Sequence, residues 1–138
     1  MKVAEFAKAA SVTPELVRYY TRIGLLQPAR EKSNGYKRFN GVDMGRLRFI
    51  LRAKRLGFAL DEIAHILSMA RHGDTPCPTV REILRGRLVE TRQRLDELVA
   101  LQARMESALT LWSGMPDGEP DGDAVCVLIN VTEDELRE

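Results

Sequence analysis

A row of apolar positions between residues 84 and 112 places the strongest limit on how this chain can fold. The positions alternate in steps of four and three residues, and seven of the nine are apolar. They are Leu84, Leu88, Thr91, Leu95, Leu98, Gln102, Met105, Leu109 and Trp112. A repeat of this kind over four heptads is typical of the seam of a coiled coil.

The length of this predicted helix implies a partner. About 35 residues at 1.5 Å each give a helix roughly 50 Å long. The domain that precedes it has only about 70 residues, too few to bury the whole apolar row. We therefore expect a second chain to cover it, and a second copy of the same chain is the simplest choice. The alternative is a long helix folded back on its own domain.

The charges are divided unevenly along the chain. The net charge is +1, but residues 1–57 carry 13 Lys and Arg against 4 Asp and Glu, which gives +9. The remaining residues carry 8 against 16, which gives −8. A basic half joined to an acidic half suggests that the first half meets a polyanion, although an ordinary dipolar protein would show the same division.

Two short helices with a tight link between them open the chain. The first is predicted from apolar residues at helical spacing, namely Val3, Phe6, Ala7 and Ala10. The second begins with Thr13 as N-cap and Pro14 at its first position, and Gly24 ends it as a left-handed cap. Its inward face is predicted to be Leu16, Tyr20 and Ile23. This arrangement indicates a helix-turn-helix.

A basic hairpin follows the two helices. Asn34-Gly35 is a strong hairpin signal, because a type I′ turn needs positive φ at both central residues. The flanking segments carry Arg30, Lys32, Lys37 and Arg38, so we read the hairpin as a basic wing. Two further helices are predicted at about 42–56, ended by Gly57, and at about 60–69.

The outward face of the second helix supplies groups suited to nucleic acid. Arg18 and Arg22 lie one turn apart on the same side, next to Tyr19. A guanidinium fork fits guanine edges or phosphate, and a tyrosine offers a hydroxyl donor and a stacking face. Any one of these residues alone would be an ordinary solvated side chain. Together with the wing they predict a surface with two prongs for double-stranded DNA.

Two prolines, Pro76 and Pro78, interrupt the helical pattern and mark a boundary. Together with the helices and the hairpin described above, this boundary predicts a mainly α fold with a winged helix-turn-helix and a long dimerisation helix. The predicted parts are a DNA-binding domain at 1–70, a hinge at 71–78, a coiled-coil helix at 79–113, and an effector-binding loop and tail at 114–138. The loop is acidic, with Asp117, Glu119, Asp121 and Asp123.

Several classes of protein are not expected. No apolar run approaches the ~18–20 residues of a membrane helix, and the N-terminus does not resemble a signal peptide. Cys77 and Cys126 are the two cysteines, so no disulfide framework is available and the cytoplasm is the expected compartment. No nucleophile with a base, phosphate-binding loop or pair of carboxylates stands at a spacing typical of an enzyme.

Three stretches of the chain closely resemble the N-terminal domain of the MerR family of transcriptional regulators. They are SVTPELVRYYTRIGLLQPAR, NGYKRF and RLRFILRAKRLGFALDEI. The resemblance runs from residue 1 to about 112 and continues more weakly to Cys126. Two positions depart from the family pattern, since Thr21 stands where the family usually has Glu and Lys37 where it usually has Arg. Lysine loses the bidentate geometry of arginine at that position.

The resemblance implies a homodimer with an antiparallel coiled coil and a winged helix-turn-helix in each protomer. Such a dimer binds a pseudo-palindromic operator in a promoter whose −35 and −10 elements are too far apart for RNA polymerase to engage both. Effector binding makes it bend and untwist the DNA, so that RNA polymerase engages both elements. By similarity, Tyr36, Lys37 and Arg38 join Arg18 and Tyr19 as DNA contacts, and Tyr20 is a core residue. With Arg22, this completes the predicted DNA-binding set.

The resemblance also bears on the two cysteines. Family members that respond to divalent soft metals have a cysteine where Cys77 stands, and a pair of cysteines after the coil. This chain keeps the second of that pair, Cys126, while Trp112 takes the place of the first and the loop is longer. In an antiparallel dimer, Cys77 of one chain would approach Cys126 of the other.

Two thiolates suit a soft ion such as Hg(II), Cd(II), Pb(II), Zn(II) or Cu(I), with a further donor from His72, Met115 or an acidic loop residue. The sequence leaves two other readings open. The cysteines could form a thiol redox switch. Alternatively, they could be buried apolar residues without a sensing role, and the chain could then be an architectural protein that shapes DNA without any effector.

Overall fold

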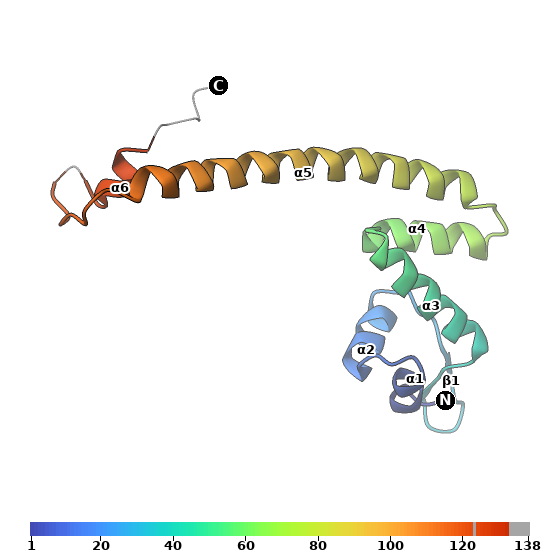
Figure 1. Ribbon diagram of the computed structural model, residues 1–138. Coiled ribbons are helices and arrows are strands. Elements are labelled where there is room, and N and C mark those ends of the chain that lie inside the picture. The colour runs from blue at the N-terminus through green and yellow to red at the C-terminus, as the bar shows by residue number, and fades with distance from the viewer. Residues whose placement is uncertain (123, 133–138) are drawn as a thin grey trace. The chain divides into compact units, whose positions relative to one another are not determined.

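The computed structural model describes residues 1–122 and 124–132. Asp123 of the predicted acidic loop and residues 133–138 of the predicted tail lie outside the described residues. Two compact units are present, which we call the head unit (Met1–Val89) and the coil unit (Glu90–Glu138), and each is described by itself. The elements are α1 (Val3–Ala9), α2 (Pro14–Arg22), β1 (Ala29–Arg30), β2 (Lys37–Arg38), α3 (Gly41–Arg55), α4 (Leu60–Arg71), α5 (Cys77–Trp112) and α6 (Val127–Asn130) (Figure 1).

Helices α1 and α2 form the predicted helix-turn-helix. Thr13 caps α2, because its side-chain oxygen accepts a hydrogen bond from the backbone N–H of Leu16 at 3.2 Å. Pro14 occupies the first helical position, where a missing N–H costs nothing. Gly24 ends the segment at φ +86, as expected of a left-handed cap.

The Thr13 cap can be tested by its effect on stability. Thr13→Ala should lower the free energy of unfolding by about 1 kcal/mol, because the N–H of Leu16 loses its acceptor. Thr13→Ser keeps the hydroxyl oxygen and should retain most of the stability. Urea unfolding of the three proteins at one concentration measures this, and an alanine variant as stable as the serine variant would contradict the capping role.

The inward face of α2 differs from the prediction in one residue. Ile23 was expected inside but is 42% exposed, because α2 ends at Arg22 and Ile23 has left the helical register. Val17, Leu25 and Leu26 fill the core instead. Tyr20 is buried as predicted, and burial raises the pKa of its hydroxyl, with a smaller contribution from Tyr19.

The remaining core of the head unit comes from α1, α3, α4 and the end of the hairpin. The Phe6 and Phe39 rings stack with their centroids 4.5 Å apart. The buried residues contributed by α3 and α4 are Leu47, Ile50, Ala53, Ile63, Ile66 and Leu67. At the start of α3, Asn40 and Asp43 form a capping box: the Asn40 side chain accepts from the Asp43 N–H at 3.1 Å, and the Asp43 carboxylate accepts from the Asn40 N–H at 2.8 Å.

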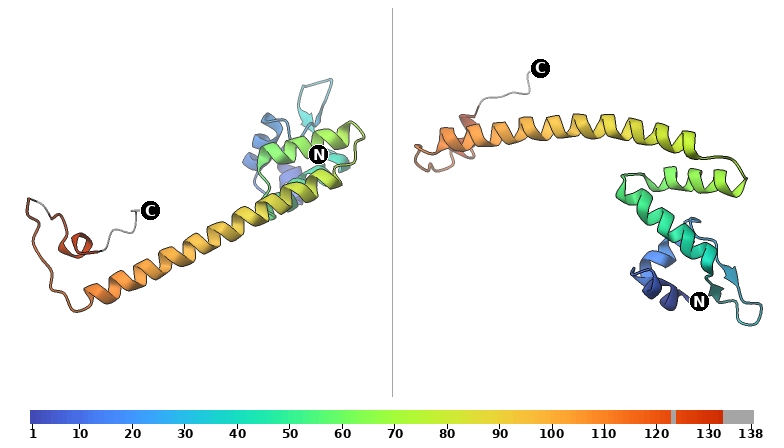
Figure 2. Two further views of the ribbon diagram at one scale, coloured as in Figure 1. Left: turned by 90° about the horizontal axis from the view of Figure 1, so that it is seen from above. Right: turned by 45° about the vertical axis from the view of Figure 1, so that its right-hand side comes forward.

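The wing is a two-stranded antiparallel hairpin in which Ala29 pairs with Arg38 and Arg30 with Lys37 (Figure 2). The predicted type I′ turn is wrong, because Gly35 has φ +72 whereas Asn34 is not in the left-handed region. The strands are joined by residues 31–36 instead. The Asn34 side chain accepts a hydrogen bond from the Tyr36 N–H at 2.9 Å, so it shapes a longer loop.

The first turns of α5 belong to the head unit. Val80, Ile83 and Leu84 pack against its core, and Arg87 forms an ion pair with Glu62 of α4. Leu84, the first position of the predicted seam, is therefore partly covered by its own chain.

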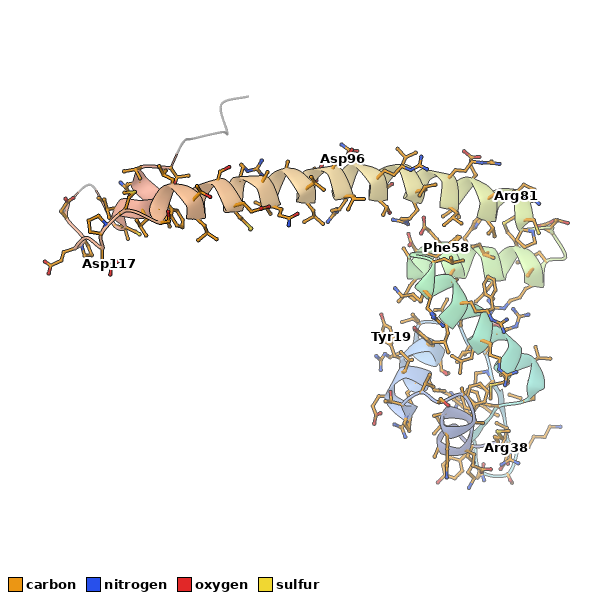
Figure 3. All side chains as sticks on the ribbon, viewed as in Figure 1. Tyr19, Arg38, Phe58, Arg81, Asp96 and Asp117 are labelled. Carbon is orange, nitrogen blue, oxygen red and sulfur yellow. The ribbon has the colours of Figure 1, made fainter. Side chains whose placement is uncertain are left out.

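Beyond these turns the apolar row of α5 is open from Leu88 to Leu109, whereas Trp112 at its end is half-buried. The helix has 36 residues, close to the predicted length, and contains no buried residue. Leu95 and Leu98 are 59% and 55% exposed, and Leu88, Met105 and Leu109 are also exposed. Figure 3 shows the side chains standing out along this part of the helix, as Asp96 does. In the described part of the chain, no helix is both long and apolar enough to cross a membrane.

Candidate nucleic-acid interface

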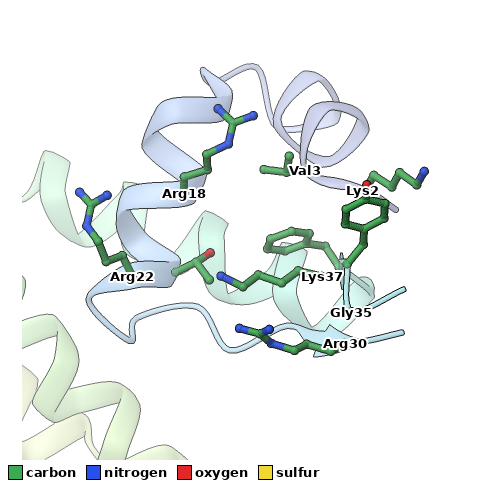
Figure 4. A pocket seen from close by; sticks show the side chains of 10 residues that line it. Lys2, Val3, Arg18, Arg22, Arg30, Gly35 and Lys37 are labelled. Atoms are coloured by element: carbon green, nitrogen blue, oxygen red, sulfur yellow. The ribbon is translucent and has the colours of Figure 1, made fainter. Parts of the chain in front are cut away.

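A hollow of about 800 Å³ lies between α2 and the wing, and we call it the recognition groove (Figure 4). Its lining residues are Lys2, Val3, Arg18, Thr21, Arg22, Arg30, Gly35, Tyr36, Lys37 and Phe39. Five of these are cations, and none of the described residues in the lining is acidic. A concave surface with one sign of charge attracts and concentrates anions.

The α2 side of the recognition groove presents Arg18 and Arg22, one helical turn apart. The Arg22 guanidinium carbon lies 5.4 Å from the centroid of the Tyr19 ring, a cation–π contact that holds the side chain against its own helix. Arg18 has a weak contact of 3.8 Å with Glu15, and both side chains are largely exposed. Arg18 is therefore free to turn toward a ligand at little cost.

The wing side presents Arg30 and Lys37. These residues are directly paired across the two strands, so their side chains lie on the same face of the ribbon. Figure 4 shows both of them directed toward the space in front of α2. Tyr36, directly before β2, lines the same side.

Lys2 also lines the recognition groove, although no pattern in the sequence had pointed to this residue. Backbone hydrogen bonds join Met1 and Phe39 in both directions, each at 2.8 Å, and so attach the N-terminus to the end of β2. The Lys2 ammonium then lies 5.4 Å from the centroid of the Tyr36 ring. Because Met1 and Phe39 are 38 positions apart, no local sequence pattern predicts that they pair or that Lys2 lies in the groove.

Four of the six predicted DNA-binding residues, Arg18, Arg22, Tyr36 and Lys37, line the recognition groove. Tyr19 is exposed beside it on α2 (Figure 3). Arg38 lies on the other face of the ribbon, where its side chain pairs with Glu31 at 2.9 Å. Successive side chains of a strand point to opposite faces, so Arg38 and its neighbour Lys37 lie on different sides of the ribbon.

The two cysteines lie at the starts of two helices, in different units. Cys77 is the first residue of α5 and is exposed, and Cys126 immediately precedes α6 and is half-buried. His72 follows α4, and its Nδ1 lies 2.7 Å from the Ser68 carbonyl oxygen, which leaves Nε2 as its outward nitrogen. Residues 1–122 and 124–132 of one chain contain no cluster of three or more metal-ligating His, Cys, Asp or Glu residues. Soft donors are present, but the described part of one chain does not gather a three-ligand site.

Two family models match the chain. The MerR HTH family regulatory protein model matches residues 1–70, and the model described as MerR, DNA binding matches residues 44–108. The chain belongs to the MerR family.

Relatives within the MerR family cover most of the chain. The mercuric resistance operon regulatory protein of Serratia marcescens is 36% identical over 110 residues, which are 80% of this chain and 72% of that protein. An uncharacterized HTH-type transcriptional regulator of Pseudomonas aeruginosa is 31% identical over 121 residues, 88% and 90% of the two chains.

The fold is also that of a solved transcription regulator. The crystal structure of the regulator PbrR691 from Ralstonia metallidurans CH34, in complex with lead(II), matches with a TM-score of 0.75 and 23% identity, and covers 94% of this chain and 97% of that one. Regulators of the MerR family are DNA-binding transcription factors and not enzymes.

Proposed function

We propose that this MerR-family protein binds operator DNA in a promoter as a homodimer and distorts it in response to an effector, which we take to be a soft metal ion. The observation that carries the DNA-binding part is the recognition groove, with five cations and no acidic residue among the described residues that line it. Phosphate contacts by such side chains supply affinity, and a guanidinium on a recognition helix supplies base contacts.

The departure at residue 21 strengthens the positive potential of the recognition groove. Thr21 lines it, and its hydroxyl donates to the Val17 carbonyl oxygen at 2.8 Å, within its own helix. The glutamate that is usual in the family would place a carboxylate at this position. The recognition groove of this chain therefore carries one negative charge fewer than the same groove in such a relative.

Dimerisation is supported by the apolar row of α5. Leu95, Leu98, Met105 and Leu109 are uncovered in one chain, and a second α5 would bury them in knobs-into-holes packing. The two heads of such a dimer match the two halves of a pseudo-palindromic operator. RNA polymerase at the same promoter is the partner that reads the change in DNA shape.

The effector site is proposed at the ends of α5. In an antiparallel dimer, Cys77 of one protomer and Cys126 of the other would supply two thiolates, and His72 would be a further donor. Thiolates are ligands for soft ions such as Hg(II), Cd(II), Pb(II), Zn(II) or Cu(I). A bound ion would connect the loop after α5 of one protomer to the start of α5 in the other. This connection would lie next to the hinge before α5, so it could change the position of the head unit.

Arg18→Ala tests the DNA-binding part of the proposal. The arginine lines the recognition groove with a largely exposed side chain, so its removal should leave the fold intact and weaken binding to a promoter fragment by about 1–3 kcal/mol per head. Fluorescence anisotropy over a range of salt concentrations measures the change.

Arg52→Ala is the matched control, because Arg52 is exposed on α3 and lies outside the groove lining. Equal affinities of the two variants would show that the recognition surface has been placed wrongly.

A further inference from the structure

A second hollow of the head unit lies on a different side of the wing from the recognition groove. It has a volume of about 380 Å³ and draws on the segment before β1, the start of α3 and the end of α4. Its lining residues are Gln27, Ala29, Asn40, Val42, Asp43, Arg46 and Arg71. We call it the arginine hollow.

Arg46 and Arg71 both line the arginine hollow, together with a single carboxylate, that of Asp43. Arg71 donates to the Leu25 carbonyl oxygen at 3.1 Å, which fixes its position, and Arg46 is half-buried. Burial lowers the pKa of Arg71, and the positive charge of Arg46 lowers it further, as expected of like charges near each other. Among the described residues, neither arginine forms an ion pair within 4.0 Å.

The one carboxylate in the lining is already engaged. Asp43 is buried and accepts a hydrogen bond from the Asn40 N–H, as part of the capping box at the start of α3. A carboxylate in the first turn is also stabilised by the helix dipole. Arg46 and Arg71 therefore keep donors that can serve an external anion, and guanidinium groups match phosphate geometry well.

The strand β1 relates the arginine hollow to the recognition groove. Ala29 lines the arginine hollow and Arg30 lines the recognition groove, and successive side chains of a strand point to opposite faces. The base of the wing thus has one cationic hollow on each face. A ribbon that enters a groove of duplex DNA has a sugar-phosphate backbone on each side of it.

We propose that Arg46 and Arg71 bind a phosphate group of the DNA backbone on the face of the wing opposite the recognition groove. The inference rests on the proposed DNA-binding function and adds a second backbone contact to each head. It gives the wing two anchored sides, which fixes how deeply and at what angle it enters the DNA groove.

Arg46→Gln tests the inference, with Arg48→Gln as its control. Arg48 lies two residues further along α3, so it faces away from Arg46, and its replacement removes the same charge. Arg46→Gln should lower the slope of log affinity against log salt by about 0.9 per head, or about 1.8 for a dimer on a promoter fragment. Arg48→Gln should leave that slope within error of the wild type.

A second variant avoids any loss of packing at Arg46. Val42 lines the arginine hollow but is 64% exposed, and it lies in the first turn of α3, where a carboxylate favours the helix. Val42→Glu should keep the wild-type melting temperature or raise it, and weaken DNA binding at least threefold by repelling the phosphate. Unchanged affinity in both Val42→Glu and Arg46→Gln would overturn the inference.

The source of the phosphate is settled by titrating inorganic phosphate into the free protein and following the Arg46 and Arg71 side-chain NMR signals. If these signals shift at low millimolar phosphate while Arg46→Gln binds DNA as the wild type does, the hollow serves a small phosphate and the DNA assignment is wrong. A wild-type protein without salt-dependent DNA binding would instead contradict the proposed function itself.

Discussion

Replacing Leu95 and Leu98 together by aspartate is expected to separate the proposed dimer into folded monomers. Both side chains belong to the open apolar row of α5 and are more than half exposed in one chain. In a dimer the two substitutions would bury four carboxylates without partners, and each such burial costs several kcal/mol. The head unit lies in another part of the chain and should keep its structure.

The control for this variant places the same charges on the opposite face of the helix. Gln93 and Ala100 are exposed and stand seven residues apart at positions far from the seam. Gln93→Asp with Ala100→Asp should therefore remain a dimer. Sedimentation velocity at micromolar concentration compares the three proteins, and a seam variant that sediments like the wild-type dimer would show that α5 is not the interface.

Cys77→Ser and Cys126→Ser are each expected to abolish transcriptional activation while leaving operator binding unchanged. Under the proposed function each thiol supplies half of a two-thiolate site, and serine is a poor ligand for a soft ion. The cysteines lie outside the recognition groove, so DNA contacts should be unaffected. The wild-type dimer should take up about two equivalents of a soft ion with loss of thiol reactivity, and each variant should take up none.

The conditions of this experiment also separate metal sensing from a redox switch. Activation by a soft ion in the presence of a reductant supports the metal site, whereas activation that requires an oxidant supports the thiol alternative. His72→Gln tests the additional donor and should weaken ion uptake if its outward nitrogen is a ligand. Normal activation in both serine variants would mean that the cysteines do not sense the effector.

The parts of the fold that local chemistry determines were predictable from the sequence. Thr13 and Pro14 mark the start of α2, and Gly24 and Gly57 mark helix ends, because capping and positive φ involve neighbouring residues. The heptad row gave the length of α5, because its pattern repeats over many turns. The family match confirmed the MerR resemblance that the motifs had indicated.

Two kinds of feature were not predictable, namely the residue at which a local pattern stops and the contacts between residues distant in sequence. Ile23 was placed in the core because its spacing continued that of α2, but the helix had already ended. Asn34 satisfied a backbone N–H with its side chain and so produced a longer loop than Asn-Gly usually forms. Lys2 lies at its site because the preceding Met1 is hydrogen-bonded to Phe39, 38 positions away, and Arg71 because it is hydrogen-bonded to Leu25, 46 positions away.

Selection of binding sites from random duplex DNA tests the central claim most directly. The protein is incubated with the pool at several salt concentrations, and the retained sequences and the number of chains per duplex are determined. We predict enrichment of an inverted repeat bound by two chains, with affinity that falls steeply as salt increases. A retained pool no different from the input at every salt concentration, or one chain bound to a single half-site, would contradict the account.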